Sequence, residues 1–296
     1  MKHLLAILVF ALTLPAFAAD SNGSQYQWQT PADKWEVTPE LSYNSMKVTL
    51  KPSGDVTIKG AQQSVKGEYG ISEMFSTGLV LTNSSVSTTY PTPPYATGTK
   101  DSEMSGLHDL EAFFHGRMPM GPGSFRFGAD VNFALSKQEV DATGRVSNNA
   151  SGGMGLKPFV GYEMTKDTCT LGARLSYKMS LGDRSKENVA PTAESKLSGA
   201  EQTALNLFFE HDMKPMILGA ALEVLSKAKE EDKIGTVTTK AAGYTSVGLK
   251  LYAPYMVTDT ITVLPAFTYA KYTAVDTENI DSQNQWTLAV GGRFQF

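Results

Sequence analysis

The sequence has little that would cross-link the chain or bind nucleic acid. Cys169 is its single cysteine, so no disulfide can form within the chain. Acidic residues outnumber basic ones, 30 against 26, and the formal net charge is −4. Nucleic-acid binding relies on an excess of clustered Lys and Arg. The charge balance therefore predicts no nucleic-acid partner.

Long apolar runs are missing after the first 18 residues, although a spanning helix needs about 20 apolar residues. Met1 to His3 precede an apolar stretch from Leu4 to Leu14, and Pro15 and the small-residue site Ala16-Phe17-Ala18 follow. This order is typical of a secretory signal peptide, and Pro15 ends the apolar run too early for a retained transmembrane helix. We expect residues 1–18 to be a cleaved signal peptide and exclude them from the fold.

Apolar and polar residues alternate along much of the remaining chain. In residues 125–135 most odd positions are apolar, and charged residues such as Arg126 stand between them; residues 169–181 show the same alternation. Alternation with a period of two indicates a strand with one apolar face. Less regular examples are found in residues 110–118, 154–164, 205–211, 216–224, 247–253 and 261–269.

The connections between these segments alternate between short and long. Short ones are expected at residues 72–74, 165–167 and 212–214, and small turns at 119–123 and 255–259. Long polar stretches begin near residues 83, 137, 182, 227 and 273, and the last three spacings are about 45 residues each. Two strands of about a dozen residues with one short and one long connection form the hairpin unit of a transmembrane β-barrel.

The sequence therefore predicts an all-β, closed antiparallel transmembrane β-barrel with up-and-down topology over residues 35–296. We count about twelve strands, with ten or fourteen as alternatives, and an even number places both termini in the periplasm. Residues 19–34 are polar and form either a periplasmic tail or a plug. The apolar parity changes between Tyr43 and Met46, which predicts a bulge near Asn44 or Ser45. The expected strands are 35–50, 55–71, 75–88, 105–118, 124–136, 153–164, 168–181, 200–211, 215–226, 243–254, 260–272 and 285–296.

The last of these strands has the dimensions of a membrane crossing. Trp286, Leu288, Val290, Phe294 and Phe296 share one face. At about 3.3 Å per residue and a tilt of about 45°, the first and last of them are about 23 Å apart along the membrane normal, close to the roughly 25 Å apolar band between aromatic girdles. The closing strand of a secreted sandwich is the alternative.

An alternating strand that ends on an aromatic residue resembles the C-terminal assembly signal of bacterial outer-membrane proteins. The resemblance implies an outer-membrane location, with outer-membrane lipid and the barrel-assembly machinery as partners. A second resemblance lies in residues 68–71, 75–81 and 106–110, which are similar to barrels linked to aromatic-degradation (phenol meta-pathway) channels. That family more usually has a small residue at the position of His108. The second resemblance implies an uptake channel.

If the apolar faces contact lipid, a set of charged residues of both signs must face the lumen. Five of them lie near the periplasmic ends of their strands and would either set the charge preference of a constriction or form a salt-bridge network that fills the barrel. The candidates for the lumen and constriction are Arg117, Arg126, Asp130, Lys157, Glu163, Arg174, Glu210, Glu223, Lys250 and Arg293, and the five near the periplasmic ends are Arg117, Arg126, Glu163, Glu210 and Arg293.

No pattern of catalytic or metal-binding residues stands out. The histidines that remain after removal of the signal, His108, His115 and His211, have no spacing typical of a metal site. No serine and histidine lie close in one strand or match across neighbouring strands. We therefore expect no enzyme, no metal and no cofactor.

These features predict a porin-like outer-membrane channel, through which small hydrophilic or amphipathic solutes diffuse passively along a polar, mixed-charge lumen. A closed structural or surface-interaction barrel with ligand-binding loops is the alternative. An outer-membrane hydrolase is the third and weaker hypothesis.

Overall fold

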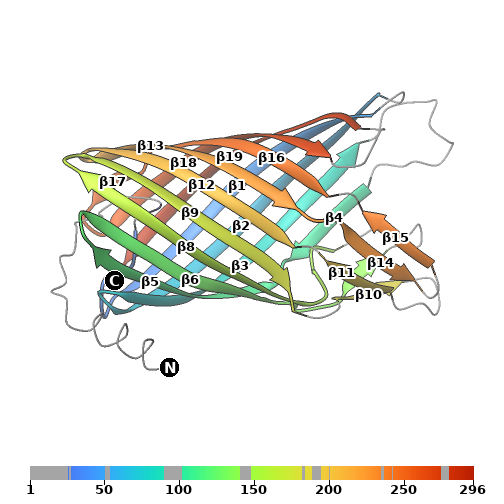
Figure 1. The fold of residues 1–296 in the computed structure, drawn as a ribbon, viewed down its shortest axis with the longest axis horizontal. Coiled ribbons are helices and arrows are strands. Elements are labelled where there is room, and N and C mark those ends of the chain that lie inside the picture. The colour runs from blue at the N-terminus through green and yellow to red at the C-terminus, as the bar shows by residue number, and fades with distance from the viewer. Residues whose placement is uncertain are drawn as a thin grey trace.

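The computed structural model describes residue 26 and residues 28–50, 54–89, 102–140, 148–181, 184–188, 195–199, 201–234, 237–241, 243–274 and 280–296. The expected signal peptide, residues 1–18, lies outside these residues. Among them, no helix has the length and apolar character to cross a membrane. They form a closed antiparallel barrel with a small second sheet at one end (Figure 1).

Twelve antiparallel strand positions form the barrel wall, which confirms the predicted fold and strand number. The barrel closes where β1 pairs with β19, and each wall strand otherwise pairs with its neighbours in sequence. Two of the twelve positions are each shared by two short strands. The wall strands are β1 (Trp35–Leu50), β2 (Gly54–Ser72), β3 (Phe75–Thr89), β4 (Ser102–Leu107) with β5 (Leu110–Met120), β6 (Gly123–Phe133), β8 (Met154–Lys166), β9 (Cys169–Ser180), β12 (Gln202–Met213), β13 (Met216–Lys227), β16 (Tyr244–Tyr252) with β17 (Tyr255–Thr258), β18 (Ile261–Ala274) and β19 (Ile280–Gln295).

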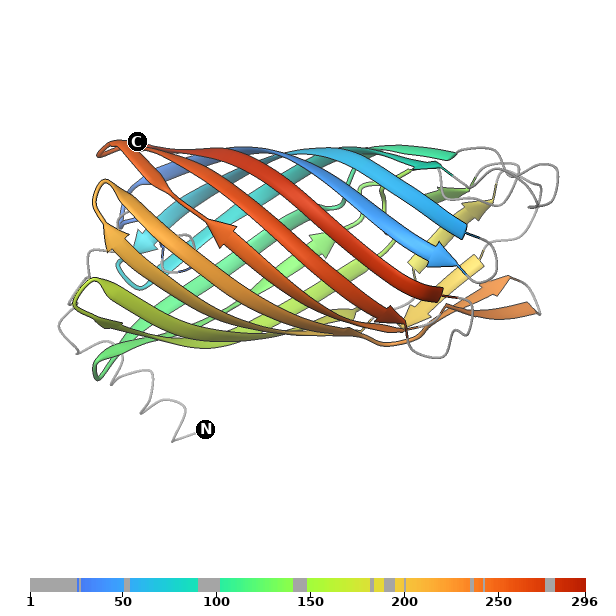
Figure 2. The same ribbon diagram turned by 90° about the horizontal axis from the view of Figure 1, so that it is seen from above.

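The two ends of the barrel differ. Short turns join the wall strands at one end, which we call the turn end, and β19 finishes there beside the start of β1 (Figure 2). The opposite end, the loop end, carries a five-stranded sheet built from the long polar connections, which the sequence had predicted only as loops. Its strands are β7 (Gln138–Val140), β10 (Arg184–Asn188), β11 (Ser195–Gly199), β14 (Glu230–Ile234) and β15 (Val237–Ala241).

Three local predictions are wrong. The turn expected at 255–259 is mostly strand, because β17 pairs with β13 and β18 and only residues 259–260 turn. The turn expected at 119–123 has two residues, and Gly121 adopts a φ of 60° there. The strand expected at 105–118 is interrupted at residues 108–109, between β4 and β5. Where each of these strands begins and ends depends on hydrogen bonds to its neighbouring strands, and apolar periodicity carries no information about those bonds.

The bulge expected near Asn44 or Ser45 is absent. The register of β1 against β2 continues without a shift along the whole of β1, and against β19 it shifts only between Thr49 and Leu50. Met46 lies on the inward face, where its sulfur accepts a hydrogen bond from Gln283. The apolar parity therefore changes because an apolar residue faces the inside of the barrel. The strand itself continues without a break there.

Apolar side chains cover the outside of the barrel and polar ones fill the inside. In β19, Leu288 and Val290 are 53% and 50% exposed, whereas Arg293 is 5% exposed. A water-soluble protein places its residues the other way round, so this surface is suited to lipid. The alternation predicted from Trp286 to Phe296 is confirmed by the exposure of both faces.

Aromatic pairs mark the two edges of the apolar surface. Trp35 and Tyr69 pack at the turn end with ring centroids 4.9 Å apart, and Tyr43 and Trp286 pack toward the loop end at 5.6 Å. Aromatic girdles at both edges are the usual boundary of a membrane-spanning band. The part of the wall between the pairs is therefore the membrane-spanning part.

Candidate functional site in the barrel lumen

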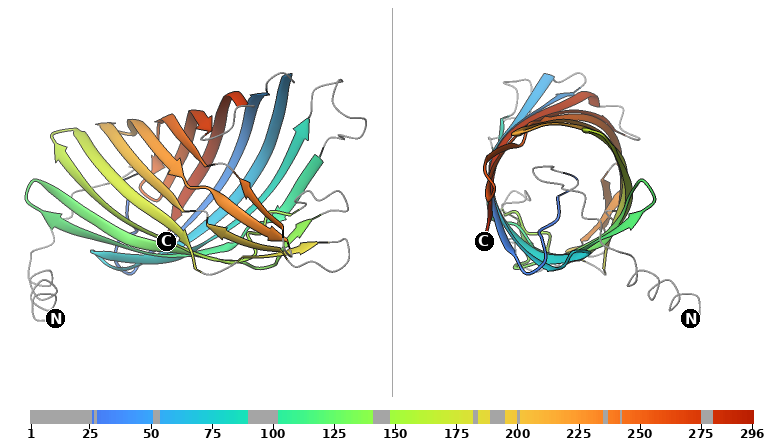
Figure 3. Two further views of the ribbon diagram at one scale, coloured as in Figure 1. Left: turned by 45° about the vertical axis from the view of Figure 1, so that its right-hand side comes forward. Right: turned by 90° about the vertical axis from the view of Figure 1, so that its left-hand side faces the viewer.

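The described residues that precede β1 lie inside the barrel. In the end-on view of Figure 3 this blue segment is enclosed by the ring of strands. We call Tyr26 and residues 28–34 the plug segment. Its end is fixed to β2, because the amide of Asp33 donates to the carbonyl of Gly70 (2.8 Å) and the Gly70 amide donates to that of Lys34 (3.0 Å). A β-carbon at Gly70 would come within 1.9 Å of the Pro31 carbonyl oxygen, so this close approach requires glycine.

Side chains of the wall hold the rest of the plug segment. The indole of Trp28 donates to the Glu36 carboxylate, and the Arg293 guanidinium lies 4.2 Å from the centre of the same indole ring. The Arg126 guanidinium donates to the amide oxygen of Gln29 (3.1 Å). These contacts come from β1, β6 and β19, so strands from distant parts of the wall hold the plug segment in the lumen.

Ion pairs fill the space around the plug segment at the turn end. Glu163 accepts a hydrogen bond from Arg126 at 3.0 Å and lies 3.4 Å from Arg117. Lys66 and Arg293 both pair with Glu36, whose side chain is fully buried. Buried charges are tolerated when each has a partner of opposite sign. The turn-end half of the barrel is thus filled by a salt-bridge network and the plug segment.

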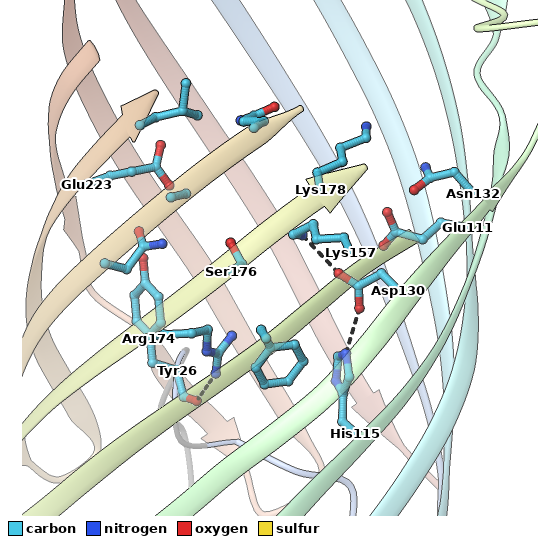
Figure 4. A pocket seen from close by; sticks show the side chains of 15 residues that line it. Tyr26, Glu111, His115, Asp130, Asn132, Lys157, Arg174, Ser176, Lys178 and Glu223 are labelled. Atoms are coloured by element: carbon cyan, nitrogen blue, oxygen red, sulfur yellow. Dashed lines mark hydrogen bonds and ion pairs between the residues drawn. The ribbon is translucent and has the colours of Figure 1, made fainter. Parts of the chain in front are cut away.

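The described residues leave open space in the loop-end half of the lumen. Two cavities, of about 350 and 290 Å³, meet at Tyr26. The first is lined from β5, β6, β8, β9, β12 and β13, and the second from β12, β13, β16, β18 and β19. In the first, Asp130 binds both Lys157 and His115 at 2.9 Å, as Figure 4 shows. The cavity walls therefore present charges of both signs beside aromatic rings.

The ten predicted lumen residues all face inward, but they fall into two groups. Arg117, Arg126, Glu163, Glu210 and Arg293 lie in the filled turn-end half. The structure places these five in a packed network and not in an open ring. The others line the cavities, and they are Asp130, Lys157, Arg174, Glu223 and Lys250.

Sequence reasoning missed the acidic residues of β1 and β2, and it left open whether residues 19–34 form a periplasmic tail or a plug. Glu36 and Glu68 are 0% and 4% exposed and accept bonds from Thr30 of the plug segment. Glu36 stands between the outward-facing Trp35 and Val37, so the alternation of β1 already carried the signal. The sequence gives no comparable indication that Tyr26 lies in the lumen, because its contacts are with residues far along the chain.

One predicted absence is also wrong. Ser84 of β3 and His108, between β4 and β5, lie within hydrogen-bonding distance, with Oγ and Nε2 2.8 Å apart. In the part of the chain that the structure describes, no carboxylate bonds the other imidazole nitrogen, and a catalytic triad needs such a group. Among those same residues, no cluster of His, Cys, Asp and Glu is arranged to hold a metal ion.

Comparisons with known proteins identify the fold. No family model and no curated protein matches the chain. An outer membrane channel from Pseudomonas putida F1 is similar over 92% of this chain and 98% of its own, with a TM-score of 0.67 and 10% identity. The match with the transport unit of the autotransporter AIDA-I from Escherichia coli spans 100% of this chain and 98% of that one, with a TM-score of 0.58 and 10% identity. The match with the TodX monoaromatic hydrocarbon channel spans 93% of this chain and 92% of that one, with a TM-score of 0.51 and 11% identity. The chain has the fold of an outer-membrane β-barrel.

Proposed function

We propose that the protein resides in the outer membrane and acts as a channel through which small hydrophilic or amphipathic solutes diffuse passively. The observation that carries the proposal is the pair of cavities inside the loop-end half of the barrel, lined by charges and aromatic rings. Two of the structures with a similar fold are described as channels, one of them for monoaromatic hydrocarbons, which supports a channel role. In this arrangement the loop end faces the exterior and the turn end the periplasm.

The lining charges favour solutes of no strong net charge. Three cationic side chains of the larger cavity, Lys157, Arg174 and Lys178, are matched by three carboxylates. Rings of one sign select ions of the other sign, whereas a balanced lining does not. The three carboxylates are those of Glu111, Asp130 and Glu223.

The plug segment stands between the cavities and the periplasm. A solute that leaves the cavities toward the turn end must pass Trp28 and the ion pairs around Glu36 and Glu163. Transport therefore requires that the plug segment shift or withdraw. Because hydrogen bonds and ring contacts hold the plug segment, apart from its peptide continuation into β1, such a shift is reversible.

A pair of glycine substitutions tests the channel. Gly70→Ala places a methyl group where the plug segment meets β2, whereas Gly67→Ala, three residues earlier on the same strand, meets nothing within 4 Å. In planar bilayers we expect small current steps from the wild type and from Gly67→Ala, and larger or more frequent steps from Gly70→Ala. If none of the three proteins produces current steps at any salt concentration or voltage, the channel proposal fails.

A closed structural or surface-interaction barrel is the second candidate, and the packed turn-end half favours it. Arg126, Glu163 and Arg293 are each at most 6% exposed and fill the barrel together with the plug segment. In this case Gly70→Ala would not conduct either, and the sheet of β7, β10, β11, β14 and β15 at the loop end would be the binding part. Protease treatment of whole cells would then remove surface binding while leaving the barrel folded.

Targeting completes the proposal. We infer that residues 1–18 direct export and are removed, and that the alternating strand ending at Phe296 is recognised by the barrel-assembly machinery. Outer-membrane lipid would then surround the apolar band between the aromatic pairs. N-terminal sequencing of the protein isolated from outer membranes tests the cleavage, because a retained residue 1 would contradict it.

A further inference from the structure

The side chain of Tyr26 occupies an aromatic slot in the wall, formed by Phe208, Ala221 and Tyr252. Its ring stacks on that of Phe208, with centroids 4.7 Å apart and planes within 10° of parallel, and the Tyr252 ring lies 5.6 Å away. Phe208 and Tyr252 are only 5% and 4% exposed with Tyr26 in place. Offset stacked rings of this kind recognise a planar aromatic group.

Charged groups bind both backbone ends of the same residue. The Glu210 carboxylate accepts a hydrogen bond from the Tyr26 amide (3.3 Å) and also one from the Tyr252 hydroxyl (3.0 Å). On the other side, the Arg174 guanidinium donates to the Tyr26 carbonyl oxygen (3.2 Å). The slot thus offers an acceptor to a nitrogen, a donor to an oxygen and a flat surface to a ring, each at a fixed place around one residue.

The slot is accessible from the loop end. Both cavities reach Tyr26, and Arg174 lines the larger one. Figure 4 shows Arg174 reaching from the cavity wall to the Tyr26 carbonyl. A solute that enters the lumen from the loop end therefore meets this residue before it meets the rest of the plug segment.

We propose that this slot is a binding site for zwitterionic aromatic solutes of the α-amino acid type, and that Tyr26 is its tethered occupant. The proposal rests on the proposed channel function and names the solute class for it. The amine of such a solute replaces the Tyr26 amide at Glu210, its carboxylate replaces the carbonyl at Arg174, and its ring stacks on Phe208. Binding of the solute displaces Tyr26 and loosens the plug segment.

The contacts with Glu210 and Arg174 favour a zwitterionic aromatic solute over aromatic solutes that carry only one of the two charges. An aromatic acid without an amine would bring its carboxylate to Arg174 but leave nothing to replace the amide at Glu210. An aromatic amine without a carboxylate would fail in the opposite way at Arg174. A hydrogen bond to an ionised partner is roughly twice as strong as a neutral one, so the zwitterion is favoured on both sides.

Titration calorimetry on the purified barrel in detergent tests the proposal with L-phenylalanine as the probe. Tyr26→Ala removes the ring that competes for Phe208 and anchors the backbone of residue 26 at Glu210 and Arg174, so this variant should bind L-phenylalanine about tenfold more tightly than the wild type. Tyr43→Ala is the matched control, because Tyr43 is exposed on the lipid face and should leave binding at the wild-type level. Migration of boiled and unboiled samples on a detergent gel verifies that each variant is folded.

Two further comparisons identify the contacts. In Tyr26→Ala, 3-phenylpropionate and phenethylamine should each bind about tenfold more weakly than L-phenylalanine, because each lacks one of the two charges. Adding Glu210→Gln should remove the advantage of L-phenylalanine over 3-phenylpropionate. Equal binding of all three probes, or no gain of affinity in Tyr26→Ala, would overturn the proposal.

Current recordings separate this proposal from the channel itself. L-phenylalanine should reduce the ion current through Tyr26→Ala at the concentrations that saturate binding. Binding without any current would refute the channel and leave the slot intact. Current that L-phenylalanine does not change, together with no binding, would refute the slot and leave the channel intact.

Discussion

Replacing Val290 of β19 with arginine should destabilise the folded barrel by about 2 to 4 kcal/mol. Val290 is 50% exposed on the lipid face and lies four residues from Trp286, which marks one edge of the apolar band. Four residues at about 3.3 Å each and a tilt of about 45° place it about 9 Å below that edge, near the middle of a band roughly 25 Å thick. An arginine there must leave its charge in hydrocarbon.

Val257→Arg is the matched control. Val257 of β17 is 53% exposed, so it offers the same residue type with similar exposure, but it lies beside the turn at residues 259–260. At an interface the same substitution costs only about 0 to 1 kcal/mol, because the guanidinium reaches water. The difference between the two variants therefore isolates depth in the membrane from the effect of the side chain.

Reversible unfolding in lipid vesicles by guanidinium chloride, followed by the fluorescence of Trp28, Trp35 and Trp286, measures both costs. The expected loss for Val290→Arg corresponds to an equilibrium constant changed by about 30-fold to 1,000-fold. If Val290→Arg were no more destabilising than Val257→Arg, the assignment of this face to the membrane interior would be refuted.

Three more outcomes follow from the same structure. Glu163→Ala should lower the free energy of unfolding by about 3 to 5 kcal/mol, because it leaves Arg126 buried without this carboxylate. The control Glu103→Ala, at an exposed position, should change it by less than about 0.5 kcal/mol. Equal losses of the two variants in vesicle unfolding would refute the network. Deletion of Phe296, which is 69% exposed, should reduce the amount of heat-modifiable barrel in outer membranes with little effect on refolding in detergent, and an unchanged amount would contradict its role as an assembly signal. Asn206→Leu should leave the fold intact on a detergent gel but lower single-channel current, because this residue lines both cavities, and an unchanged current would place the solute path elsewhere.

Strand positions were predictable from the sequence because lipid imposes one requirement on every wall strand. Each crossing must present apolar side chains at alternate positions, so β1 was predicted with its exact bounds and β19 with its outward and inward faces. The interruption between β4 and β5 was missed, although the outward face changes from odd positions such as Leu107 in β4 to even positions such as Phe114 in β5. The strands of the small loop-end sheet were missed because polar residues that pair outside the membrane carry no apolar period.

The candidate site was predictable only in part. Inward charges such as Arg126 and Glu163 could be identified one strand at a time, and the sequence left open whether they form an open ring or a packed network. Strand register decided for the network, because Arg126 and Glu163 lie on the neighbouring strands β6 and β8 near the turn end. Arg126 and Glu163 are 37 residues apart in the sequence, and this separation alone does not indicate that their side chains are in contact.

The sequence by itself determined that this chain folds as a membrane barrel and, for most strands, which face contacts lipid, since those properties depend on the alternation of neighbouring residues. Only the tertiary structure decided what fills the barrel. Tyr26 reaches Glu210 across 184 residues of chain, and Trp28 reaches Arg293 of the last strand. The interior of a closed barrel brings together side chains from all of its strands, and that set exists only once the first and last strands have paired.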